Sequence, residues 1–151
     1  MSEREPTYHS PESTGRINRF IDFRSDLYSL GVVLYQMFAG RLPFETADRM
    51  QLIHAHIARE PIPPKECDPS LAPVISDIIM KLLSKPAINR YQNAWSLGTD
   101  LKRCLEQFNR KGGIDNFSIG VRDRIEKVHF PQILYGRNDE LDILSKECDR
   151  G

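Results

Sequence analysis

The chain has 151 residues, of which 40% are hydrophobic and 28% charged, as is usual for a globular protein with a single core. The 21 basic and 21 acidic side chains cancel, so the composition gives no support to binding of nucleic acid or of a membrane surface. The three cysteines are widely spaced, and the polar N-terminus lacks the apolar run of a secretory signal. Both features predict a cytoplasmic protein with reduced thiols.

The first strong helical pattern runs from Asp26 to Gly40. Residues 1–25 before it show neither a helical nor a strand period and are expected to form a loop. Asp26 is suited to cap the start of the helix, and Gly40 is suited to stop it. Apolar residues cover nearly its whole circumference, which predicts a helix buried on all sides. Gly31 costs roughly 1 kcal/mol relative to alanine, so we expect a close packing contact there.

A second helix is expected from about Asp48 to Arg59, with Thr46 or Asp48 as its N-cap. His54 and His56 are two residues apart, so they point to different sides of this helix. They cannot share a metal ion as an i, i+4 pair can. We therefore expect surface or half-buried histidines and no metal site.

Two further helices follow a proline-rich connector at residues 60–70, which should be stiff. The first should begin after Ser70 or Ala72, because Pro73 suits a first helical turn and apolar residues recur there at i, i+4 spacing. The second should run from about Ala94 to Phe108. Its apolar residues share one face, with the single tryptophan, Trp95, as a packing anchor beside it. The residues of that face are Ala94, Leu97, Leu101, Leu105 and Phe108.

Three motifs occur in the order and spacing of the C-terminal lobe of protein kinases, which residues 8–108 resemble. They are Ser10-Pro11-Glu12 in place of Ala-Pro-Glu; Asp26-Leu27-Tyr28-Ser29-Leu30-Gly31-Val32 followed by Gly40-Arg41-Leu42-Pro43-Phe44; and Asn89-Arg90-Tyr91. The resemblance is closest to bacterial serine/threonine kinase domains that continue into an AAA-type ATPase module. It implies a mostly α fold, the helical C-lobe of the protein-kinase-like fold, with a C-terminal linker and a short helix.

The resemblance also implies a domain organisation. Residues 1–108 would be a partial kinase domain that starts at the end of the activation segment, and residues 109–133 would be a linker. Residues 134–151 would begin a following ATPase-like module, since Tyr135-Gly136-Arg137 matches its opening and Asn138 can cap a helix.

Particular residues acquire expected roles from the resemblance. Glu12 and Arg90 match a buried ion pair of the family; the alternative is two unrelated surface charges. Asp26 matches a residue that anchors the catalytic-loop backbone, or it serves only as a helix cap. Tyr8 and Ser10 match the wall where the substrate peptide docks, or they are ordinary loop residues.

The motifs of phosphoryl transfer do not occur in these 151 residues. We find no Gly-x-Gly-x-x-Gly, Val-Ala-x-Lys, His-Arg-Asp or Asp-Phe-Gly. No catalytic, cofactor-binding or metal-binding residue is therefore assigned, and the chain alone is expected to be inactive. In the complete family domain, ATP and Mg²⁺ would be bound by parts lying N-terminal to Met1.

Three hypotheses for function remain open. In the first, the chain is part of a serine/threonine protein kinase and provides substrate docking and a scaffold; its partners are a protein substrate or the upstream kinase half. In the second, it is a non-catalytic protein-interaction remnant of a kinase domain. In the third, it belongs to an ATPase subunit, which would require a phosphate-binding loop after Gly151. No nucleic-acid or membrane partner is expected.

Overall fold

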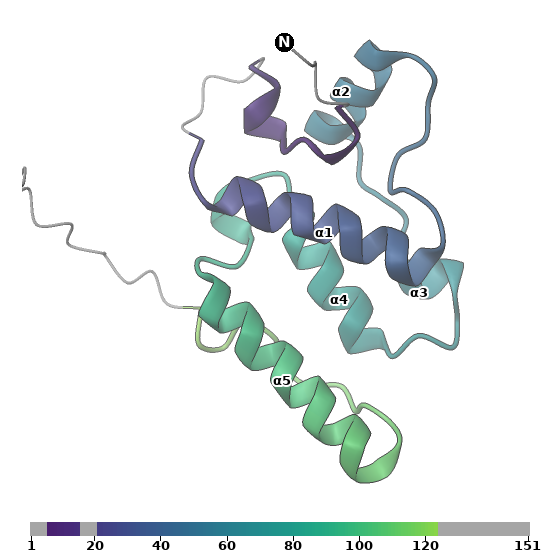
Figure 1. Ribbon diagram of the computed structural model, residues 1–151, viewed down its shortest axis with the longest axis vertical. Helices are drawn as coiled ribbons and strands as arrows, with labels where there is room; N and C mark the ends of the chain where they lie inside the picture. Colours follow the sequence, from purple (N-terminus) through teal and green to yellow (C-terminus); the bar gives the residue numbers. More distant parts are fainter. Residues whose placement is uncertain (1–5, 16–20, 124–151) are drawn as a thin grey trace, which may run out of the picture.

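The computed structural model of the chain describes residues 6–15 and 21–123, and within them the secondary structure is helical with no strand (Figure 1). The elements are η1 (Pro6–Tyr8), η2 (Pro11–Thr14), α1 (Arg24–Ala39), α2 (Arg49–Ala58), α3 (Pro64–Cys67), α4 (Pro73–Leu82), η3 (Ala87–Asn89) and α5 (Ala94–Lys111). The mostly α fold expected from the sequence is confirmed. Within the described ranges, no helix is both long enough and apolar enough to cross a bilayer.

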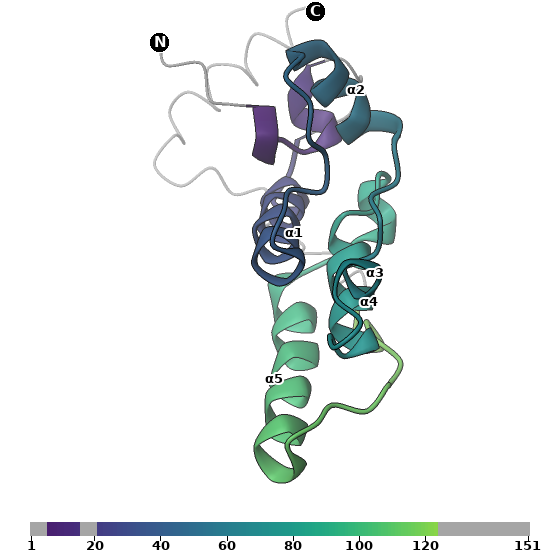
Figure 2. The same cartoon turned by 90° about the vertical axis from the view of Figure 1, so that its right-hand side faces the viewer.

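Helix α1 lies at the centre, with α4 packed along it and η1 contacting it from Ser29 to Gln36. Figure 2 shows α1 and α5 on one side of the molecule and α3 and α4 on the other. Buried side chains of α1, α4, α5 and the loop between α4 and α5 form two adjoining core clusters. They are Leu27, Val74, Ile78, Leu82, Tyr91, Leu97 and Cys104 in one, and Tyr28, Val32, Tyr35, Ile79 and Leu83 in the other.

The start of α1 differs from the sequence expectation. The helix begins at Arg24, whose backbone N–H donates to the Asp22 carboxylate at 2.9 Å. Asp26 therefore lies in the first turn instead of capping the helix. The end agrees with expectation: Gly40 has a left-handed φ of 69°, and its N–H donates to the Gln36 carbonyl, which closes the helix.

The expectation that α1 is buried on all sides is wrong for the part of the protein that the structure describes. The buried face carries Tyr28, Val32 and Tyr35, whereas Leu30, Val33 and Met37 remain exposed. The exposed residues follow i, i+3, i+7 spacing and so form one stripe. These three side chains are 38–69% exposed, so no described element buries them.

Gly31 makes the close contact that its position predicts. A Cβ atom at residue 31 would lie 2.8 Å from the Leu82 Cβ, closer than real side chains approach. The missing side chain thus lets α1 and α4 pack directly against each other.

We expect Gly31→Ala to destabilise the protein by about 1–3 kcal/mol, because the overpacked α1–α4 contact outweighs the gain in helix propensity. Gly98→Ala on α5 is the matched control, since nothing lies within 4 Å of a Cβ atom there. The control should stabilise by up to about 1 kcal/mol. Urea unfolding of both variants tests this, and equal stabilisation by the two would contradict the proposed contact.

Helix α5 ends three residues later than predicted, at Lys111, where Gly112 with a φ of 70° terminates it. Its buried face holds Leu97, Asp100 and Cys104. Trp95 is 62% exposed, so the prediction that it anchors the packing is wrong. Its ring instead faces the Arg122 guanidinium, 5.7 Å from the ring centroid. Leu101, Leu105 and Phe108 are also largely exposed.

The chain after α5 returns along the helical body. Ile114, Phe117 and Ile119 pack against the core cluster that contains Leu82 and Leu97. The described part of the expected linker, up to residue 123, is therefore attached to the helices. The expected ATPase-like segment, residues 134–151, lies outside the described residues.

Candidate functional site

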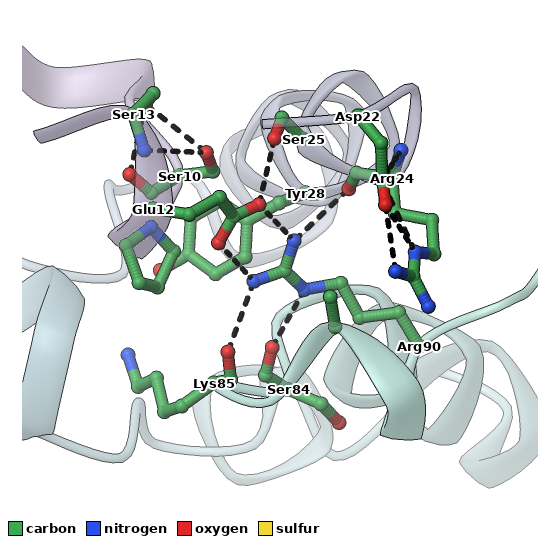
Figure 3. Close-up of polar contacts among 12 residues, drawn as sticks. Ser10, Glu12, Ser13, Asp22, Arg24, Ser25, Tyr28, Ser84, Lys85 and Arg90 are labelled. Atoms are coloured by element: carbon green, nitrogen blue, oxygen red, sulfur yellow. Dashed lines mark hydrogen bonds and ion pairs between the residues drawn. The ribbon is translucent and has the colours of Figure 1, made fainter. Parts of the chain in front are cut away.

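The structure brings together the two charged residues that the sequence analysis pairs, Glu12 and Arg90 (Figure 3). The guanidinium donates Nη1–H to Oε1 at 2.6 Å and Nη2–H to Oε2 at 2.9 Å, a bidentate arrangement. Arg90 has 0% relative exposure, and Glu12 is also buried. Ser25, from the first turn of α1, donates its hydroxyl to Glu12 Oε1 at 2.7 Å.

Arg90 also holds backbone from two other segments. Its Nε donates to the Ser84 carbonyl at 2.8 Å, Nη2 to the Lys85 carbonyl at 3.0 Å, and Nη1 to the Arg24 carbonyl at 3.0 Å. Together with the two bonds to Glu12, these bonds use all five guanidinium N–H groups. Arg90 therefore joins the η2 segment, the start of α1 and the loop after α4.

The electrostatics of the pair favour ionised Glu12. Burial alone would raise the pKa of this carboxyl, but the hydrogen bonds from Arg90 and Ser25 outweigh burial and lower the pKa to about 2. The Tyr28 ring lies beneath the guanidinium, with its centroid 4.9 Å from Arg90 Cζ. Because every polar group of the pair is bonded inside the protein, the pair has a structural role and is not placed to react with a ligand.

A second buried polar cluster, centred on His56 of α2, adjoins the ion pair. The Tyr28 hydroxyl lies 2.9 Å from His56 Nδ1, and the imidazole packs edge-to-face against Phe44. Burial lowers the pKa of His56 to about 4, with the positive charge of Lys85 adding to the effect. The Lys85 ammonium lies over the Phe44 ring at 4.5 Å and donates to the Ala55 carbonyl at 3.3 Å.

Sequence reasoning missed this cluster. It placed the apolar stripe of α2 at Met50, Ile53 and Ile57, whereas the buried residues are Leu52, Ala55 and His56. The spacing i, i+3, i+4 of those three would have marked the face, but only if a histidine were counted as a core residue. Within residues 6–15 and 21–123, no group of three His, Cys, Asp or Glu side chains could hold a metal ion.

The remaining predicted site residues do not converge. The Tyr8 hydroxyl donates to Gln36 Oε1 at 3.0 Å, and its carbonyl accepts from Ser29 at 2.7 Å. Ser10 is buried and caps η2 by accepting from Ser13 N. Asp26 is exposed in the first turn of α1, whereas Ser10 is buried.

Comparison with known proteins identifies similar sequences. The chain is 34% identical, over 91% of its length, to hybrid signal transduction histidine kinase G of Dictyostelium discoideum. It is 38% identical, over 84% of its length, to a probable serine/threonine-protein kinase of Clostridium perfringens. It is 41% identical, over 78% of its length, to histidine protein kinase 1 of Candida albicans.

The chain is kinase-related. It spans 5%, 18% and 5% of the lengths of these three relatives, respectively. No family model matches it. Glu12 and Arg90 are 78 positions apart in this kinase-related sequence. Their buried ion pair therefore joins two distant segments of the chain.

Proposed function

We propose that this chain is part of a serine/threonine protein kinase, namely the helical C-terminal lobe from the end of the activation segment onward. Its role is to hold the segment on which a protein substrate docks and to support the ATP-binding half. The observation that carries the proposal is the buried, bidentate Glu12–Arg90 pair, which fastens that segment to the helices in a kinase-related chain. Tyr8, half-exposed on the same segment, would contact the substrate; Ser10, turned inward, would shape the loop.

Phosphoryl transfer would then reside in another part of a longer protein. ATP and Mg²⁺ would be held by the glycine-rich loop, lysine and aspartates of that part, since none of those motifs occurs in these 151 residues. The chain matches 5–18% of the length of these relatives, which supports placing phosphoryl transfer in another part of the protein.

Exposed apolar residues support the proposal that another part of the same kinase packs against this chain. The α1–α5 face comprises side chains that are 36–69% exposed on two helices lying on one side of the molecule (Figure 2). Its members are Leu30, Val33, Met37, Leu101, Leu105 and Phe108. Large exposed apolar surfaces mark interaction sites. We assign as its occupant an apolar segment of the upstream kinase half.

Asp26 adds a polar feature to this face. It precedes Leu30, Val33 and Met37 on the same stripe of α1, at i, i+4, i+7 and i+11 spacing. Its exposed carboxylate has no hydrogen-bond partner among the described residues. We propose that it accepts hydrogen bonds from backbone N–H groups of the upstream segment, as a catalytic-loop anchor would.

The occupied face predicts a difference between two forms of the protein. Met37→Asp should change the stability of the 151-residue chain by less than about 0.5 kcal/mol, because residue 37 is exposed there. In the full-length kinase, the same change would bury an unpaired carboxylate and should cost more than about 2 kcal/mol. Thermal unfolding of both forms measures the difference.

Met50→Asp is the matched control, since Met50 is 49% exposed on α2 and lies outside the α1–α5 face. It should have a similar small effect in both forms. If Met37→Asp were equally mild in the full-length protein, the upstream half would not cover this face.

The proposed activity is tested by tagging the chain at its native gene and purifying the product. We expect a protein with a mass above 17.4 kDa that transfers phosphate from labelled ATP to serine or threonine. The Arg90→Ala variant should lose this transfer. Peptide mapping by mass spectrometry would show whether the missing motifs are present. A product without such motifs and without transfer would overturn the proposal in favour of the non-catalytic interaction remnant.

A second candidate is that the longer protein is a multi-module signalling protein with histidine kinase activity. Two of the relatives described above are histidine kinases by name, and the match to the Dictyostelium protein covers 91% of the chain. In such a protein, residues 134–151 would open an AAA-type ATPase module. The two candidates differ chemically, because phosphohistidine is lost in acid whereas phosphoserine and phosphothreonine survive it.

A further inference from the structure

The segment from Gly112 to Asp123, here called the strap, runs from the end of α5 back to the loop that carries Arg90 (Figure 1). It is attached along its length. The Asp115 N–H donates to Gln107 at 2.8 Å, and the Arg103 guanidinium lies 4.2 Å from the centroid of the Phe117 ring. The strap therefore follows a defined path over the helices.

Two buried carboxylates secure the far end of the strap. Asp100 on α5 accepts the Gly120 N–H at 2.7 Å, and the same oxygen accepts the Tyr91 hydroxyl at 2.7 Å. Asp123 belongs to the strap itself, and its side chain is only 7% exposed. One Asp123 oxygen accepts the Gln92 N–H at 2.6 Å, and the other lies 3.3 Å from the Lys81 ammonium.

Gln92 extends this connection to the ion pair. Its side-chain NH₂ group donates to the carbonyls of Ala87, Ile88 and Arg90, at 3.0, 3.0 and 2.7 Å. Its side-chain oxygen accepts from Arg24 Nη1 at 2.7 Å. One residue thus shapes the loop that carries Arg90 and holds the start of α1.

A continuous set of bonds therefore joins the strap to the η2 segment. Asp123 bonds to Gln92, Gln92 bonds to the backbone of Arg90, and Arg90 bonds to Glu12. Hydrogen bonds to charged groups are stronger than neutral ones, and they are strengthened further when buried. The links join the strap, the Arg90 loop and η2, three segments that lie outside α1 and α4.

We propose that the strap is a regulatory connection, through which the chain beyond Asp123 controls how firmly Arg90 holds the Glu12 segment. The inference deepens the proposed function and rests on it for the meaning of that segment as the substrate-docking part. Pulling the strap away would release Gln92, allow the Arg90 loop to shift and weaken the ion pair. The coupling is reciprocal, so loss of the ion pair should also loosen the strap.

Hydrogen exchange of the 151-residue chain tests the connection. In Asp123→Ala, the Ser13 amide, which donates to the Ser10 carbonyl at 3.1 Å, should exchange roughly tenfold faster, as a loss of ~1.4 kcal/mol would cause. The α4 amides should be unaffected. Asp115→Ala is the control, because the partner that the described part of the chain offers this strap carboxylate is the exposed Lys111. It should leave Ser13 exchange unchanged.

A double-mutant cycle gives an independent measurement. Glu12→Gln and Asp123→Asn, which preserve side-chain shape, should destabilise the protein less together than the sum of their separate effects. Additive effects, or equal acceleration of Ser13 and α4 exchange, would overturn the connection. Neither measurement uses kinase activity, so the connection and the proposed function can fail separately.

Discussion

Replacing Arg90 by alanine should lower the free energy of unfolding by about 3–5 kcal/mol, the usual cost of removing one partner from a buried ion pair. The variant would leave the Glu12 carboxylate buried without its two strongest donors. It would also leave the carbonyls of Ser84, Lys85 and Arg24 without the bonds that Arg90 supplies. Equilibrium unfolding in urea at pH 7 measures the loss.

Arg90→Lys is the informative companion variant. A lysine keeps the charge but lacks the planar fork that bonds Glu12 and three carbonyls at once, so most of the loss should remain. Lys102→Ala is the control, since it removes only an exposed ion pair with Glu106 and should cost less than about 1 kcal/mol. If Arg90→Ala lowered the free energy of unfolding no more than this control, the ion pair would not hold the η2 segment to the helices.

Acidification from pH 6.5 to pH 4 should destabilise the protein by up to ~3 kcal/mol through His56 alone. Burial beside Lys85 lowers the pKa of His56 to about 4 in the folded state, from 6.5 in the unfolded chain. Between these values the unfolded state binds more protons, so stability decreases as the pH falls. Urea unfolding across this range measures the slope.

His56→Phe tests the origin of that slope. Phenylalanine preserves a ring beside Phe44 and cannot titrate, so the slope between pH 6.5 and 4 should flatten. A second loss, below pH 4.5, should persist in this variant, because the lowered pKa of Glu12 makes its ionised form stabilising above that pH. Glu12→Gln should remove the second loss. An unchanged slope in His56→Phe would assign the acid sensitivity to other groups.

Local sequence patterns predicted several features correctly. The apolar spacing of α4 and the glycine at the end of α1 mark helices by short-range rules, and both elements are present. Gly31 was expected at a close contact because glycine is costly within a helix, and Leu82 provides that contact. The pairing of Glu12 with Arg90, 78 positions apart, was suggested only by the resemblance to kinases.

Other features depend on which elements meet in space. Periodicity places Leu101, Leu105 and Phe108 on one face of α5, but it cannot say whether another element covers that face. A polar residue such as His56 becomes part of the core only because Tyr28 provides a hydrogen bond there. No sequence rule used here marks such a partner in advance.

The sequence by itself determined the helical character of the protein and its relation to kinases, because helix signals lie within a few residues and motifs are read along the chain. The tertiary structure alone decided that apolar residues of α1 and α5 remain exposed and that Asp123 reaches Gln92. The physical reason is that burial and hydrogen bonding are properties of the neighbours in space. Those neighbours come from segments far apart in the sequence, brought together only when the chain packs.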